Sequence, residues 1–263
     1  MNTPMPRMPA LFVSHGSPMN ALAANTFTAT WQGLGKDLPR PQAILAISAH
    51  WYTRGTFLTG NAAPATIHDF GGFPKALSEV QYPAAGDPAL AAQLAQQLVP
   101  FAASVRSDWG LDHGSWSVLL HMYPAADIPV VQLSIDAAQS PSFHYRLGAA
   151  LGPLRDRGVL ILGSGGIVHN LARADWRNAL PPPPWAVEFD EFVRARVLAG
   201  DDTALVEYGT LGEAAQLSIP TPEHYLPLLY VLGSRAPGEP ASIPLTGFDL
   251  GTIGMTVVKL GTA

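Results

Sequence analysis

Short apolar runs rich in β-branched residues recur along the chain between helical patterns, and this alternation restricts the fold more than any other feature. Each run lies close to Gly, Pro or polar turn residues, as buried strands do. The predicted strands are Ala10–Val13, Ala43–Ser48, Pro129–Ile135 and Val159–Leu162. The predicted helices are Pro88–Leu98, Pro141–Arg157 and Trp185–Leu198. Strands that alternate with helices predict an α/β fold built as a layered sheet.

Two further segments complete the expected organisation. Pro181 to Pro184 is a run of four prolines, which predicts an extended polyproline connector between elements. Gly247 to Leu260 carries glycines among β-branched residues and predicts a late strand pair or an edge strand, with the pairing direction left open. No internal repeat interrupts the chain. We therefore expect one domain over residues 1–263.

Composition excludes several classes of protein. With 48% hydrophobic and 13% charged residues, the 263-residue chain is able to bury a full core. Its net charge of -5 and its lack of a Lys and Arg cluster argue against nucleic-acid binding. No apolar run reaches the roughly 20 residues of a membrane helix, and the first ten residues lack the apolar stretch of a secretion signal. We expect a soluble, cytoplasmic protein that does not bind membranes.

The absence of cysteine excludes disulfides, thiolate ligands and a Cys nucleophile, so His, Asp and Glu remain as possible metal ligands. Three of the eight histidines lie where predicted strands end. His15 and His50 close two apolar runs directly, and His169 follows a third run after a short glycine-rich turn. Ligands collect at strand ends in open α/β sheets. These imidazoles therefore predict one shared pocket that holds a metal, and imidazole suits Fe, Zn, Cu and Ni alike.

The glycine-rich stretch GSGGIVHN at residues 163 to 170 invites two other interpretations. It is neither a G-x-G-x-x-G nor a Walker sequence, so it is a weak candidate for a phosphate loop. It also lacks the G-x-S-x-G pattern of a nucleophile elbow. We therefore expect Ser164 to be structural.

Several motifs, in order over residues 12 to 233, resemble one enzyme family. They are FVSHGSP, ISAHW, HDFGGFP, LDHGSWSVLLHMYP, PVVQLSI, GSGGIVHNL and PTPEHYLPLLYVLG. This set is similar to the DODA-type (4,5-DOPA extradiol dioxygenase) branch of the LigB-like class III extradiol ring-cleavage dioxygenases. The resemblance implies a layered α/β domain whose mixed central sheet is flanked by helices. It also implies a mononuclear metal enzyme that inserts both atoms of O2 into a catechol.

The resemblance also implies the metal ligands. His15 and His50 correspond to two family histidines that bind the metal. His224 of PEHYLPLL is the preferred third ligand, and its neighbour Glu223 is the alternative. If this segment is helical, Thr221 is the N-cap, Pro222 is the first helical residue, and Glu223 is a first-turn carboxylate that complements the helix dipole.

Other motif positions imply roles around the metal. His169 matches the family acid/base histidine and is also a possible fourth ligand. His113 matches a histidine that hydrogen-bonds substrate or oxygen, the alternative being a helix-start residue beside Asp112. The loop with His68, Asp69, Phe70 and Phe73 is expected to line the catechol pocket. His121 and His144 lie in helical patterns and are expected to be structural.

Fe(II) is the cofactor expected for activity, because a redox-active metal with open positions overcomes the spin barrier between O2 and a catechol. Zn(II) is a possible bound metal. The predicted reaction gives a muconic semialdehyde-type product from DOPA or another substituted catechol. A zinc hydrolase using Glu223 or His169 as base is the alternative, and a non-catalytic binding domain is the third possibility. The ring substituent, the side of cleavage and the oligomeric state stay open.

Overall fold

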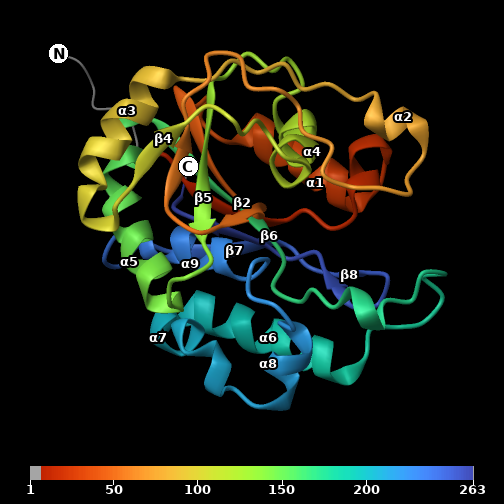
Figure 1. Ribbon diagram of the computed structural model, residues 1–263. Coiled ribbons are helices and arrows are strands. Elements are labelled where there is room, and N and C mark those ends of the chain that lie inside the picture. The colour runs from red at the N-terminus through yellow and green to blue at the C-terminus, as the bar shows by residue number, and fades with distance from the viewer. Residues whose placement is uncertain (1–6, 263) are drawn as a thin grey trace.

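An eight-stranded mixed sheet forms the centre of the computed structural model, which describes residues 7–262 (Figure 1). Residues 1–6, part of the segment searched for a secretion signal, lie outside the described residues. The strand order is β4-β3-β5-β2-β6-β1-β10-β7, with β8 and β9 as a separate pair. The strands are β1 Ala10–Ser14, β2 Ala43–Thr53, β3 Phe57–Thr59, β4 Ser104–Arg106, β5 Val130–Asp136, β6 Val159–Gly165, β7 Ala241–Leu245, β8 Phe248–Asp249, β9 Ile253–Gly254 and β10 Val257–Leu260.

Parallel strands form the middle of the sheet and antiparallel strands flank them. β2 pairs in parallel with β5 and β6, and β6 pairs in parallel with β1. β3 runs antiparallel to β5, while β10 runs antiparallel to both β1 and β7. The carboxyl ends of the four parallel strands therefore meet at one edge. The predicted α/β class with a mixed central sheet is confirmed.

Helices cover both faces of this sheet (Figure 1). α1 and α4 pack on one face, and α3, α5, α6 and α9 pack on the other. Alternate residues of β1 enter the two cores: Leu11 and Val13 face Trp116, whereas Ala10 and Phe12 face the opposite side, as a two-residue period requires. The helices are α1 Thr26–Asp37, α2 Lys75–Ser78, α3 Pro88–Gln97, α4 His113–Met122, α5 Pro141–Leu151, α6 Pro184–Ala199, α7 Asp202–Val206, α8 Glu213–Ser218 and α9 Leu226–Gly233.

One predicted strand is longer than expected, and the difference shapes the site. The apolar pattern predicted a strand that ends at Ser48, but β2 continues to Thr53. Its pairing with β5 shifts register between Ile47 and Tyr52, where β2 carries three more residues than β5. Such an irregularity re-aims side chains beside a functional site. His50 therefore lies within β2 at the irregular stretch, and not after the end of the strand.

Other boundaries also differ from the prediction. The helix that begins at Pro141 ends at Leu151 and continues as a 3₁₀ helix over Gly152–Arg157, because Pro153 has no N–H to extend the α-helical pattern. Pro184 is the first residue of α6 and not part of the connector, a position that suits proline. The run from Gly247 forms the β8–β9 pair as well as β10, which lies between β1 and β7, so the edge strand is β7.

Within residues 7–262, none of the helices combines the length and the hydropathy needed to cross a membrane.

Candidate metal centre

Five histidines from distant parts of the chain meet at the edge where the parallel strands end. His15 follows β1, His50 lies in β2, His113 begins α4, His169 follows β6, and His224 lies in the turn before α9. The ring centroid of His15 lies 5.0 Å from that of His50, 5.5 Å from that of His113 and 5.4 Å from that of His224. His169 stacks on His224, with centroids 3.5 Å apart and planes 5° from parallel. The structure thus brings together the five histidines predicted as metal ligands or catalytic residues.

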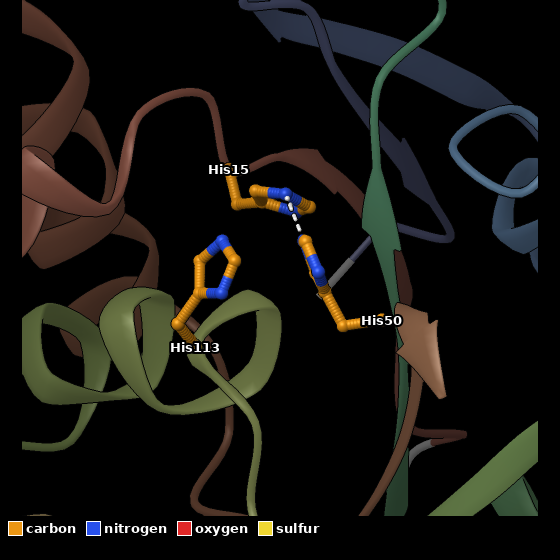
Figure 2. Close-up of side chains that lie close together, drawn as sticks. All are labelled: His15, His50 and His113. Carbon is orange, nitrogen blue, oxygen red and sulfur yellow. Dashed lines mark hydrogen bonds between the residues drawn. The ribbon is translucent and has the colours of Figure 1, made fainter. Parts of the chain in front are cut away.

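Three of these rings converge most closely (Figure 2). One nitrogen each of His15, His50 and His113 lies within 4.8 Å of the other two. The Nε2 atoms of His15 and His50 are 3.1 Å apart. Two imidazole nitrogens that share a cation at about 2.0–2.1 Å are roughly 2.8–3.4 Å apart at right-angled to tetrahedral geometry. The spacing of His15 and His50 therefore suits two ligands of one metal ion.

The carboxylate of Asp69 contacts the Nδ1 atoms of two of the rings. Its Oδ2 lies 3.0 Å from His50 Nδ1, and its Oδ1 accepts bonds from His113 Nδ1 at 2.9 Å and from the backbone N–H of His113 at 3.0 Å. A ring that donates its Nδ1–H in this way keeps the Nε2 lone pair free for a metal. Burial opposes ionisation of Asp69, but the bonds from His113 and His50 outweigh it and hold the pKa of the carboxyl far below its usual value.

Ser164 orients His15 in the same manner. Its hydroxyl donates to the carbonyl of Gly114, so its oxygen accepts the Nδ1–H of His15 at 2.9 Å. His15 is only 1% exposed, and burial together with the neighbouring histidines lowers the pKa of its ring well below 6.5. The ring is therefore neutral, with its Nε2 lone pair directed away from Ser164. Ser164 was expected to be structural, and its positioning of His15 had no sequence signal.

His224 lies in a turn and not in a helix. α9 begins at Leu226, and the backbone N–H groups of Tyr225 and Leu226 both donate to the carbonyl of Pro222 at 3.0 Å. The N-cap expected at Thr221 is therefore absent. Burial is the main cause that keeps the pKa of His224 well below 6.5, and the nearby ring of His169 is the next. The ring of His224 is therefore neutral too.

Glu223 lies behind His224. Its Oε1 accepts a bond from Thr221 Oγ1 at 2.8 Å and lies 3.2 Å from His224 Nδ1. Because this carboxylate contacts Nδ1 of the imidazole, it orients the ring and leaves Nε2 without a bond to Glu223. Glu223 is not among the residues that line the cavity over the histidines.

Two glycines allow this close assembly. A Cβ on Gly165 would lie 2.0 Å from the carbonyl oxygen of His224, which accepts a bond from Gly166 N at 2.8 Å. A Cβ on Gly114 would lie 2.9 Å from the ring of His50. The glycine that ends β6, Gly165, therefore lets the chain around His224 come close to the sheet.

His169 differs from the other four histidines. Its backbone N–H donates to the carbonyl of Ser218 at 2.9 Å, but its ring nitrogens bond to no other residue in the range 7–262. Burial is the main cause that lowers the pKa of His169 to about 4. The ring is therefore neutral at pH 7 and has a nitrogen available to a ligand in the cavity.

A cavity of about 540 Å³ opens over the histidines. Phe70 and Phe73 line it, whereas Asp69 lies behind the histidines. His68 does not line it: its Nε2 bonds to the carbonyl of Val80 at 2.9 Å and thereby anchors the loop. Several further residues line the cavity and were not predicted from the sequence; they are Gly16, Ser17, Pro18, Gly71, Gly72, Leu171, Trp176, Leu250 and Ile253.

The sequence of residues 6–234 matches the family model of the catalytic LigB subunit of aromatic ring-opening dioxygenase. The chain belongs to the LigB family. This LigB-family chain is 51% identical to "4,5-DOPA dioxygenase extradiol" of Escherichia coli (strain K12) over 97% of its length and 95% of that protein. It is 37% identical to the protein of the same name from Beta vulgaris, over 91% of each chain.

A solved structure supports the same assignment. The crystal structure of an uncharacterized protein from Escherichia coli K12 superposes with a TM-score of 0.85, at 46% identity over 97% of this chain and all of the other. The LigB-family chain is accordingly an extradiol ring-cleavage dioxygenase, and its fold is that of its relatives.

Proposed function

We propose that the chain, as one catalytic domain over residues 1–263, cleaves the ring of a substituted catechol beside its two hydroxyls. The substrate is DOPA or another substituted catechol, the co-substrate is O2, and the product is of the muconic semialdehyde type. The observation that carries this proposal is the 3.1 Å spacing of the His15 and His50 Nε2 atoms at the floor of a 540 Å³ cavity. Two imidazoles whose Nδ1 atoms are bonded to Ser164 and Asp69, with open space above their Nε2 atoms, suit a metal that also binds a ligand.

In this proposal His15, His50 and His224 hold the metal, which is Fe(II) for activity, while Zn(II) is able to occupy the same site. His113 is the alternative third ligand, because one of its ring nitrogens lies within 4.8 Å of a nitrogen of His15 and of His50. His169, whose ring stacks on that of His224, is the possible fourth ligand. The donor set fits, since imidazole binds both metals. A bound Fe(II) would acidify the catechol and would pass electron density from the catechol, which is oxidised, to O2.

The residues around the metal divide the remaining tasks. His169, neutral at pH 7 and unbonded at its ring, accepts a proton from a catechol hydroxyl and returns it later in the reaction. His113, whose Nδ1 is held by Asp69, uses Nε2 to hydrogen-bond the substrate or oxygen. Phe70 and Phe73 pack against the ring of the catechol.

The test is oxygen uptake by the Fe(II)-loaded protein, prepared without oxygen and offered a panel that includes DOPA and caffeate. We expect one O2 consumed for each catechol and a yellow product. Failure to consume O2 or to colour any member of the panel would contradict the proposal. Hydrolysis of an ester or amide panel by the Zn(II)-loaded protein, with no ring cleavage after iron is restored, would support the hydrolase alternative instead.

A further inference from the structure

We infer that Asp112 supplies a buried negative charge that stabilises the metal ion held by His15 and His50, although it makes no hydrogen bond to either ring. The inference rests on the metal site of the proposed function and adds to that site a residue that acts through its charge. It follows from the burial of Asp112, from the kind of partners that its carboxylate has, and from the hydrogen bonds that connect it to the two histidines.

The carboxylate of Asp112 is fully buried, and each of its partners donates a hydrogen bond to it. The hydroxyl of Ser48 donates to Oδ1 at 2.6 Å, and the backbone N–H of Ser115 donates to the same oxygen at 3.2 Å. The side-chain amide of Gln132 donates to Oδ2. An ionised carboxylate only accepts hydrogen bonds, so this set of partners suits the charged form.

None of these partners carries a positive charge. Among the residues that the structure describes, no Lys, Arg or His side chain forms an ion pair with Asp112. By contrast Asp190, a similarly buried carboxylate on α6, pairs with Arg194 at 2.7 Å. A buried charge is costly unless it is paired or lies near a metal. A cation bound at the histidines would supply Asp112 with the opposite charge that its neighbouring side chains do not provide.

Hydrogen bonds through Ser48 join Asp112 to His50. The hydroxyl of Ser48, which donates to Asp112, accepts the backbone N–H of His50 at 3.2 Å. Both Ser48 and His50 lie in the irregular stretch of β2. A Cβ on Gly114 would lie 2.9 Å from Cδ2 of His50 and 3.3 Å from Oδ1 of Asp112. The carboxylate and the ring of His50 are therefore at most about 6 Å apart, a range over which a charge acts on its neighbours.

The helix that follows Asp112 also orients His15. Asp112 is the N-cap of α4. In the first turn of this helix, the carbonyl of Gly114 accepts the hydroxyl of Ser164, whose oxygen in turn accepts the Nδ1–H of His15. Asp112 is thus connected to His15 through α4 and to His50 through β2.

Asp112 differs in burial from the two carboxylates that contact the histidines directly. The side chains of Asp69 and Glu223 are 18% and 22% exposed, whereas Asp112 is 0% exposed. Water and salt screen an exposed charge, but they screen a buried charge much less. The charge of Asp112 therefore acts on the metal site through the protein interior, without direct contact with a ligand ring.

The experiment removes the charge and keeps the hydrogen bonds. In Asp112→Asn the amide oxygen still accepts from Ser48 and Ser115. The new amide nitrogen donates to Gln132 once the amide of Gln132 rotates by half a turn. We expect the affinity for Zn(II), measured by competition with a chromophoric chelator, to fall at least about tenfold. Equal affinity in Asp112→Asn and the natural chain would overturn the inference.

Three further variants separate charge from geometry. The control Asp190→Asn makes the same charge change at a buried carboxylate of α6 and should keep the natural affinity for Zn(II). Asp112→Asn combined with Gln132→Glu returns one negative charge to the same pair of side chains, and should restore the affinity to within about threefold. A loss that this double variant does not recover would assign the effect to geometry and overturn the inference. If Asp112→Asn does not fold, Asp112→Ser keeps an N-cap hydroxyl, removes the same charge and must show the same loss.

Binding of an anion to the metal-loaded protein gives a readout of opposite sign. At saturating Zn(II), the anion of 4-nitrocatechol should bind Asp112→Asn at least about threefold more tightly than the natural chain, because one negative charge near the site is gone. Loss of a purely structural contact would weaken this binding. Equal or weaker binding, measured from the absorption of the bound anion, would overturn the inference.

The outcomes also separate the inference from the proposed function. If the natural chain binds no Zn(II), the proposed metal site fails and the inference fails with it. If the natural chain binds Zn(II) and cleaves catechols while Asp112→Asn binds Zn(II) equally well, the function stands and the inference alone is wrong.

Discussion

Asp69 accepts a hydrogen bond from the imidazole of His113, with Oδ1 and Nδ1 2.9 Å apart. Its other carboxylate oxygen bonds to His50, so one side chain fixes two rings that approach each other to a centroid distance of 3.8 Å. These rings come from two different elements, His50 from β2 and His113 from α4 (Figure 2). The carboxylate is thus a positioning group for the metal centre.

The substitution Asp69→Asn tests that role. An amide has one acceptor oxygen and so cannot accept from both rings, and loss of a partner behind a metal-binding histidine costs about 10–100-fold in metal affinity. We expect a loss of Zn(II) affinity in that range, measured by competition with a chromophoric chelator. The control Asp108→Asn removes a surface carboxylate that pairs with Arg106 and should leave the affinity unchanged. Full affinity in Asp69→Asn would contradict the positioning role.

Removal of two histidines should separate metal binding from turnover. We expect His15→Ala to lose bound metal, because its Nε2 faces that of His50 at 3.1 Å. We expect His169→Ala to keep most of its metal but to lose about 10²–10⁴-fold in kcat, the usual contribution of a general acid or base. Metal content by mass spectrometry and oxygen uptake are the measurements. Full turnover in His169→Ala would contradict the assignment of His169 as a general acid or base.

A second pair of variants tests the third ligand. If His224 binds the metal, His224→Ala should lose at least about tenfold more metal affinity than His113→Ala, since a direct ligand matters more than the groups around it. His113→Ala should instead lower kcat/KM while retaining metal. The opposite order of affinities would assign the third position to His113, which forms the tightest trio with His15 and His50.

His144 provides a pH test away from the metal centre. Its ring bonds to Tyr230 at 2.9 Å, and burial lowers its pKa to about 4, against about 6.5 in the unfolded chain. Between these values the unfolded state binds more protons, so the contribution of His144 is complete above pH 6.5 and is lost as the pH falls towards 4. Linkage sets this loss at about 3 kcal/mol at most.

The measurement is the free energy of unfolding in urea between about pH 4 and 6.5. We expect His144→Gln to be less stable than the natural chain at neutral pH and to lose less stability on acidification. The matched control His121→Gln changes another helical histidine, whose ring is partly exposed, and should keep the natural slope. Equal slopes for the natural chain and His144→Gln would contradict the assignment.

The strands in the middle of the sheet could be predicted from the sequence. The apolar runs located β1, β5 and β6 to within three residues, because strands buried on both faces are continuous and apolar. The extension of β2 beyond Ser48 escaped prediction, since its register depends on the partner strand β5. Pairing between strands is decided by tertiary contacts that no local pattern contains.

The histidines of the site could also be predicted from the sequence, whereas the residues that hydrogen-bond and orient them could not. His15, His50 and His169 followed from their places after apolar runs, and family resemblance added His113 and His224. The bond between His15 and Ser164 joins residues 149 positions apart, so no spacing reveals it. The separate roles of His68 and Asp69 were equally hidden, because neighbouring side chains in a loop point in directions that the fold decides.

The most direct test of the metal centre is an oxygen-free crystal structure of the metal-loaded protein with a bound catechol, in which anomalous scattering locates the ion. We predict one ion bonded to the Nε2 atoms of His15 and His50 and to a third histidine, with both catechol oxygens also on the ion. The ring of the catechol should lie in the cavity beside Phe70 and Phe73. An ion bound away from His15 and His50, or a catechol outside this cavity, would contradict the account.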